Sequence, residues 1–100
     1  MVGMQFRLTG NGLALSNQLR AYAEYRFFTS TARYASGVAV VQMTLRHDGD
    51  VYFCTAVIDL APSGILTIQA RAPHPNAAID RVAERAARLL SRRDLRPVSS

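Results

Sequence analysis

The chain has 100 residues, of which 49% are hydrophobic and 19% are charged, with a formal net charge of +5. This length suits one domain with one core, and the ordinary composition excludes a disordered chain. We expect a single domain over residues 1–100, with its core at about 4–93 and a frayed tail at 94–100. No hydrophobic run approaches the roughly 20 residues that span a bilayer, and the N-terminus lacks a secretory signal. We therefore expect a cytoplasmic protein that has no membrane partner.

The cysteine and arginine content excludes some kinds of site and favours one class of protein. Cys54 is the only cysteine, which excludes an intrachain disulfide and a multi-cysteine metal site, and we expect neither a metal nor a cofactor. All 12 basic residues are arginine. The planar guanidinium binds phosphate bidentately, so this usage favours a nucleic-acid-binding protein. A genome that prefers arginine codons explains the same composition, and composition alone leaves both explanations open.

The first half of the chain predicts a strand followed by a helix. Apolar and polar residues alternate over residues 4–9, as in a half-buried strand, and Gly10-Asn11-Gly12 ends the pattern. Ser16 is placed to cap a helix from residue 17 to about 30. The apolar side of this helix contains Leu19, Tyr22, Ala23 and Phe27.

Three strands and a second helix are predicted in the remainder of the chain. The strands cover 38–46, 51–60 and 65–72, and the tetrapeptide His47-Asp48-Gly49-Asp50 forms a hairpin turn between the first two. Alternation in the strand over residues 51–60 points Cys54 inward and Phe53 toward the opposite face. Pro75 suits a first helical turn, and the helix follows over residues 76 to about 92.

This order of elements predicts an α+β fold, a two-layer sandwich of the type β-α-β-β-β-α. Four amphipathic strands need a cover on one face, and two helices are enough to provide it. The first helix is a right-handed crossover between parallel strands, and the Asp-Gly turn makes the next pair of strands antiparallel. We therefore expect a four-stranded mixed sheet with both helices on the same face.

The second predicted helix carries a row of arginines at spacings of four, three and four residues. At about 100° per residue, these side chains fall within roughly 60° of one another, opposite the apolar side of the helix. The row, called the arginine ridge below, consists of Arg81, Arg85, Arg88 and Arg92. Like charges one turn apart repel, so we interpret the ridge as a surface that faces phosphates. A helix side that is simply solvated is the alternative.

Three other features permit more than one interpretation. Arg26 projects toward the packed side of the first helix, where a long side chain can keep its charged end in water. Tyr25 and Phe28 project away from that side, and the open face of the sheet carries Val40, Phe53, Val57 and Ile65 among threonines. These exposed apolar groups indicate a protein-interaction module, for example a homodimer through Tyr25, Phe28 or the open sheet face.

Several segments together resemble the family of ribosome hibernation-promoting factors and ribosome-associated inhibitors. They are Met4-Gln5-Phe6-Arg7-Leu8-Thr9-Gly10-Asn11, Leu19-Arg20, Arg26-Phe27 and Ala77-Ala78-Ile79-Asp80. The resemblance covers about residues 4–93 and implies a fold similar to a double-stranded RNA-binding domain. The chain looks like a short, single-domain form of the family.

The resemblance also implies a function and a set of site residues. It implies a noncatalytic factor that binds the small ribosomal subunit and its rRNA near the decoding region, and that inhibits translation in stress or stationary phase. The RNA-binding positions that it implies are Arg20, Arg26, Arg85, Arg88 and Arg92, and the ridge spacing adds Arg81.

Catalytic groups are sparse in the sequence. His47 and Asp48 belong to a predicted turn, and His74 lies between two prolines. Cys54 alternates with inward residues of a strand, where a thiol is buried and inert. We therefore expect no enzymatic activity and no catalytic residues.

Overall fold

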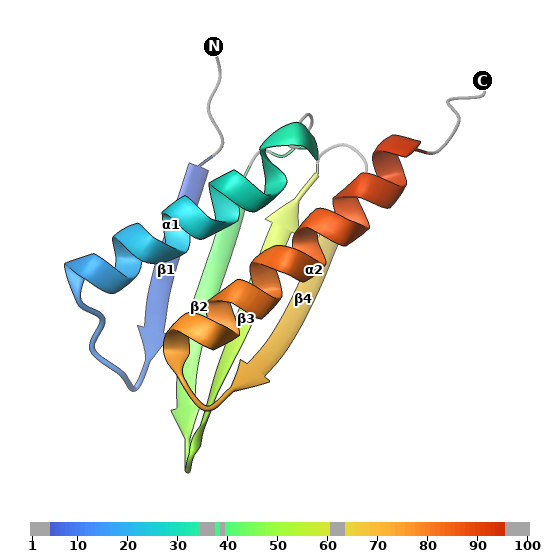
Figure 1. Cartoon of the computed structure of the whole chain (residues 1–100). Helices are drawn as coiled ribbons and strands as arrows, with labels where there is room; N and C mark the ends of the chain where they lie inside the picture. Colours follow the sequence, from blue (N-terminus) through green and yellow to red (C-terminus); the bar gives the residue numbers. More distant parts are fainter. Residues whose placement is uncertain (1–4, 35–37, 39, 61–63, 96–100) are drawn as a thin grey trace.

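The computed structural model describes residues 5–34, 38, 40–60 and 64–95, and the side chains as far as Arg92. The elements appear in the predicted order β-α-β-β-β-α (Figure 1). Their bounds are β1 Gln5–Asn11, α1 Asn17–Thr31, β2 Val40–Asp48, β3 Val51–Asp59, β4 Ile65–Ala72 and α2 Pro75–Leu95.

The strands form one four-stranded sheet in the order β1-β2-β3-β4. Strand β1 is parallel to β2, and α1 makes the connection between them, whereas β2–β3 and β3–β4 are antiparallel. Both helices lie on the same face of this sheet (Figure 1). The predicted two-layer α+β sandwich with a mixed sheet is therefore confirmed.

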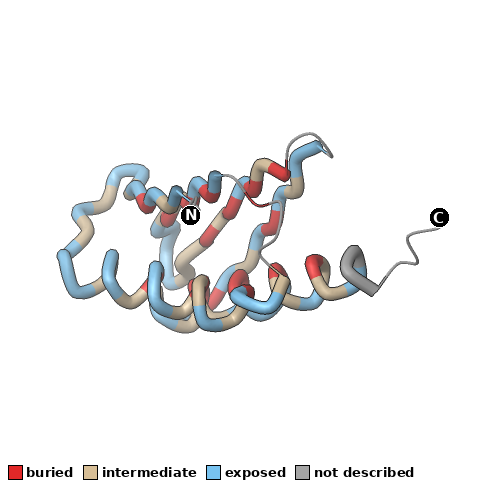
Figure 2. Tube along the Cα trace, turned by 90° about the horizontal axis from the view of Figure 1, so that it is seen from above, coloured by how far each residue is buried: buried red, intermediate tan, exposed pale blue. Residues whose placement is uncertain are grey.

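The core lies between the sheet and the two helices, where the buried positions of the strands and helices face one another (Figure 2). Phe27 of α1, Met43 and Ile58 of the sheet, and Ile79 of α2 are completely buried. Because side chains alternate along each strand, the remaining ones lie on the other face of the sheet, which no described helix covers. That open face carries polar side chains together with Phe53, Val57 and Ile65.

Strand β1 continues to Asn11, beyond the predicted end at residue 9. Gly10 and Asn11 still pair with Leu45 and Arg46 of β2. The glycine is needed because a Cβ at residue 10 would collide with the Leu13 carbonyl oxygen. Gly12, with φ of 70°, is the residue that ends the extended conformation.

The β2–β3 turn is tighter than predicted. His47 and Asp48 belong to β2 and pair with Tyr52 and Val51, so the loop consists only of Gly49 and Asp50. Only the first loop residue, Gly49, has a positive φ of 62°, the pattern of a type II′ turn.

The two helices begin as predicted, and α2 ends later. The Ser16 hydroxyl accepts a hydrogen bond from the Leu19 N–H at 3.0 Å, so the predicted cap is confirmed. Helix α2 starts at Pro75 and continues to Leu95, and two of its last three residues, Arg93 and Leu95, are strong helix formers. Residues 94 and 95, expected in the tail, are therefore helical. Residues 4, 39 and 96–100, which the predictions included, lie outside the described residues.

We predict that Phe27→Ala lowers the free energy of unfolding by about 3–5 kcal/mol, because it leaves a cavity under α1. Urea denaturation followed by circular dichroism measures the change. Tyr25→Ala on the same helix is the matched control, since this side chain is 65% exposed. A loss as large for the control as for Phe27→Ala would contradict the assigned core.

The Cys54 thiol is predicted to be unreactive in the folded protein. Its side chain is completely buried, and burial raises its pKa from 9.0 to about 12. Because the folded state keeps this thiol neutral, its contribution to the free energy of unfolding is lost as pH rises from about 9 to about 12. Labelling by a chromogenic disulfide at mildly alkaline pH should therefore follow unfolding. Rapid labelling without denaturant would contradict this burial.

Candidate nucleic-acid interface

Helix α2 packs against β3 and β4 with its apolar side and turns its arginine ridge outward. Ile79, Val82, Ala86 and Leu90 on the inner side are completely buried. All four ridge arginines are exposed. The outward orientation expected from the helical spacing is therefore present in the structure.

Two ridge arginines are held by the backbone of β4. Nη1 of Arg81 donates to the Arg71 carbonyl at 2.6 Å, and Nη1 of Arg85 donates to the Gln69 carbonyl at 2.8 Å. Strand β4 is the last strand of the sheet, so these carbonyls face its free edge. A guanidinium has five N–H donors, and one bond to a neutral carbonyl leaves its charge and four donors available.

The other two ridge arginines, Arg88 and Arg92, have neither a hydrogen bond nor an ion pair within the part of the chain that the structure describes. No ridge arginine forms an ion pair with a described carboxylate. The ridge therefore keeps four guanidiniums that are not paired with a carboxylate in the described ranges.

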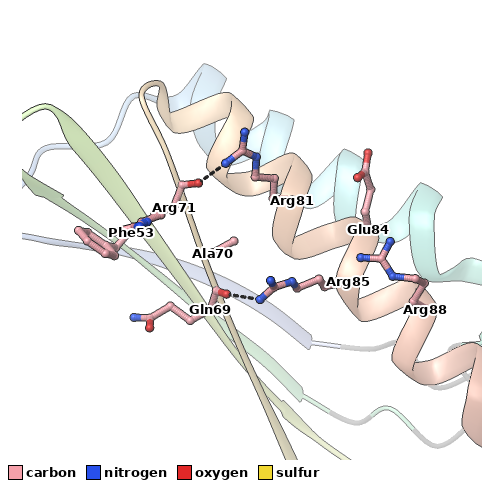
Figure 3. A pocket seen from close by; sticks show the side chains of 8 residues that line it. All are labelled: Phe53, Gln69, Ala70, Arg71, Arg81, Glu84, Arg85 and Arg88. Atoms are coloured by element: carbon pink, nitrogen blue, oxygen red, sulfur yellow. Dashed lines mark hydrogen bonds between the residues drawn. The ribbon is translucent and has the colours of Figure 1, made fainter.

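An open groove of about 540 Å³ runs between α2 and β4 (Figure 3). Arg81, Arg85 and Arg88 line it from the helix, and Gln69 and Arg71 line it from the strand. Phe53, Ala70 and Glu84 complete the lining. Four arginines and one carboxylate give this lining a formal charge of +3, which suits a polyanionic ligand.

Arg26, one of the two positions predicted on α1, differs from the ridge arginines because it is paired with a carboxylate. Nε of Arg26 donates to Oδ1 of Asp80 at 2.8 Å, and Nη2 lies 3.8 Å from Glu84. The Tyr22 hydroxyl donates to the same Asp80 oxygen at 2.6 Å, and this bond raises the pKa of Tyr22. Arg26 therefore links α1 to α2, and a quarter of its side chain remains exposed.

Arg20, the other position predicted on α1, bonds to a strand carbonyl as Arg81 and Arg85 do, but at the opposite edge of the sheet. Its Nη1 donates to the Leu8 carbonyl of β1 at 2.6 Å, while the residue as a whole is exposed. The structure thus brings Arg81, Arg85 and Arg88 together in one groove, and it places Arg20 on the far edge of the sheet.

Sequence reasoning did not assign Arg71, Phe53 or Gln69 to the site. Strand alternation gives the face of each of these side chains, and it places Phe53 on the open face. The pairing of Phe53 with Arg71 depends on the β3–β4 register, which the sequence does not specify.

The exposed apolar groups predicted as a partner surface differ in their surroundings. Tyr25 is 65% exposed, and Ile65 is 69% exposed at the end of the open sheet face. Phe28 is only half-buried, but its ring lies 6.0 Å from that of Phe6 and packs against the core. Tyr25 therefore projects into solvent, whereas Phe28 is part of the packing between α1 and β1.

Comparison with known proteins identifies the family. The family model described as "Sigma 54 modulation protein / S30EA ribosomal protein" matches residues 6–96. The chain belongs to this family. Membership indicates a ribosome-associated factor, so the resemblance to hibernation-promoting factors is confirmed. A comparison with curated proteins finds no match.

Two solved structures share the fold of this S30EA-family chain. One is a ribosomal subunit interface protein from Coxiella burnetii, with a TM-score of 0.84 and 18% identity, over 91% of this chain and 98% of that chain. The other is the N-terminal domain of Protein Y from Thermus thermophilus, with a TM-score of 0.77 and 24% identity, over 90% of this chain and 98% of that chain.

No helix in the described ranges is long and apolar enough to cross a membrane. The same ranges contain no group of three or more histidine, cysteine, aspartate or glutamate residues placed to hold a metal ion.

For this S30EA-family chain, we predict that Asp80→Ala lowers the free energy of unfolding by about 1–2 kcal/mol. The change removes the shared acceptor of Tyr22 and Arg26, both of which are partly exposed. Urea denaturation measures the loss. A double-mutant cycle with Arg26→Ala should give a coupling of about 1 kcal/mol.

Glu84→Ala is the matched control on the same helix. Its carboxylate is 63% exposed and lies 3.8 Å from Arg26, so the change should stay within about 0.5 kcal/mol. Additive effects of Asp80→Ala and Arg26→Ala would mean that this interhelical bond does not stabilise the fold.

Proposed function

We propose that the protein binds small-subunit rRNA near the decoding region and thereby inhibits translation in stress or stationary phase. The observation that carries this proposal is the arginine ridge, whose charges are not paired with any described carboxylate. Membership of a ribosome-associated family supports the choice of ribosomal RNA as the polyanion. The proposed place of action is the cytoplasm, where ribosomes translate, and inhibition follows from occupancy without any catalytic step.

The geometry of the ridge supports binding through phosphates and shape. The bonds to β4 carbonyls hold two of the guanidiniums in place before RNA arrives, so little side-chain entropy is lost on binding. Each planar fork can then bind a phosphate bidentately. Contacts to phosphates position a protein on RNA without reading its sequence, which suits a target defined by a folded RNA surface.

Arg20 and Arg26 are proposed as secondary contacts. Arg20 uses one N–H for a bond within the protein and keeps the others for RNA. Arg26 uses Nε for Asp80 and Nη1 for Ser30, so it keeps fewer N–H donors. Because Asp80 already balances the charge of Arg26, we expect Arg26 to contribute less than a ridge arginine.

A protein-interaction module remains the second candidate, and the observation that favours it is the exposure of Tyr25 and Ile65. This function would use Tyr25 or the open sheet face to form a homodimer or to hold a regulatory protein. Binding of this kind would survive ribonuclease and would not depend on the ridge.

We predict that Arg88→Glu combined with Arg92→Glu abolishes cosedimentation with small ribosomal subunits. Both side chains are exposed and have no described partner, so the fold should be retained. Arg7 is exposed on β1 at the opposite edge of the sheet, so Arg7→Glu is the control for a charge reversal outside the ridge. Unchanged cosedimentation of the double variant would reject the ridge as the binding site.

Salt dependence gives an independent measurement. If each ridge arginine neutralises one phosphate, the logarithm of the binding constant should fall with the logarithm of salt concentration with a slope of roughly −3. Replacing two of the four should reduce the magnitude of this slope by about half. A salt-independent interaction would favour the protein-interaction module.

A further inference from the structure

We propose that the groove between α2 and β4 binds a single RNA strand and stacks one unpaired base against Phe53. The inference rests on the proposed function and specifies the form of RNA that the site accepts. It concerns residues of the sheet, Phe53, Gln69 and Arg71, in addition to the ridge.

The groove passes around the free edge of β4. Its helix side consists of ridge arginines, and Figure 3 shows Phe53 and Gln69 on the other side of the β4 ribbon. Phe53 and Arg71 are paired in register across β3 and β4 on the open face of the sheet. An RNA strand that follows the basic lining would therefore run from α2, past the β4 edge, to the Phe53 ring.

The cations of the groove match one phosphate backbone. At 1.5 Å per residue, Arg81 and Arg88 are separated by about 10 Å along the helix axis. Successive phosphates of one strand that lies along the groove can therefore each meet a guanidinium. The groove volume, about 540 Å³, lies within the range of roughly 300–1,000 Å³ that holds small ligands.

Phe53 already stacks with one planar group, a guanidinium, and an aromatic ring has a second face for a base. The Arg46 guanidinium lies 4.5 Å from the centroid of the ring, and Arg46 is itself held by Asp48 at 3.6 Å. Phe53 is half-buried, so part of it remains accessible from the groove. Aromatic rings and arginine planes both stack on unpaired bases, whereas the paired bases of a duplex are already stacked on one another.

Glu84 is the one acidic residue of the lining, and its position does not block the strand. It lies 3.8 Å from Arg26 on α1, which offsets part of its charge, and it is 63% exposed. Gln69 donates its side-chain amide N–H to the Thr55 hydroxyl at 3.2 Å, and its side-chain oxygen Oε1 remains available to a base edge. The groove therefore combines cations for phosphates, a ring for stacking and a fixed amide.

The test compares a short, unstructured RNA with the same strand annealed to its complement, using fluorescence anisotropy. Phe53→Leu retains an apolar side chain and removes the ring, so we expect it to bind the single strand about 10-fold more weakly and the duplex unchanged. Val57→Ala, on the same face and strand, is the control and should bind both RNAs as the wild type does. Thermal denaturation checks that each variant is folded.

A second measurement uses the wild-type protein. Ultraviolet crosslinking to a strand that contains 5-iodouridine, followed by mass spectrometry of peptides, should identify Phe53 as a crosslinked residue. Crosslinks confined to other parts of the chain would overturn the proposal even if Phe53→Leu did not fold.

The outcomes separate this inference from the proposed function. If Phe53→Leu binds the single strand normally while Arg88→Glu with Arg92→Glu weakens binding, the stacking site is overturned and the ridge function stands. If the ridge variant also binds RNA normally, both proposals fail. Equal weakening of single strand and duplex by Phe53→Leu would also reject a site specific for one strand.

Discussion

The burial of one face of the sheet beneath two helices is the constraint on which the site depends. Because α2 must turn Ile79, Val82 and Leu90 toward β3 and β4, the side that carries the ridge lies outside the core, along the free edge of β4. The arginines on that side cannot be withdrawn without exposing the core. The fold therefore holds a row of like charges together although they repel one another.

The bonding of the arginines explains how such a row remains both ordered and charged. Arg81 and Arg85 are held by carbonyls of β4, which orient a guanidinium without neutralising it. Arg26, in contrast, is held by the Asp80 carboxylate and links the two helices. The identity of the acceptor, carbonyl or carboxylate, thus distinguishes arginines that present charge from one that mainly stabilises the fold.

Local patterns predicted most of the fold, and contacts between distant segments accounted for the rest. Alternation in the strands and the 3.6-residue period of α2 were sufficient to predict the layers and the direction of the ridge. The ends of β1 and β2 were misplaced because Gly10, His47 and Asp48 look like turn residues, while strand pairing keeps them extended. The bond from Arg26 to Asp80 and the Phe53–Arg71 pair join segments far apart in sequence, and no periodicity encodes them.

The bonds from arginine side chains to strand carbonyls have a consequence for the concentrated protein. Both outer strands of the sheet accept such a bond, β1 from Arg20 and β4 from Arg81 and Arg85. An outer strand with unoccupied carbonyls is a template on which another chain can add a strand and start aggregation. The guanidiniums occupy these acceptors and place positive charge beside them, so two copies repel each other where their sheets would otherwise join. The same side chains would thereby keep the free protein dispersed.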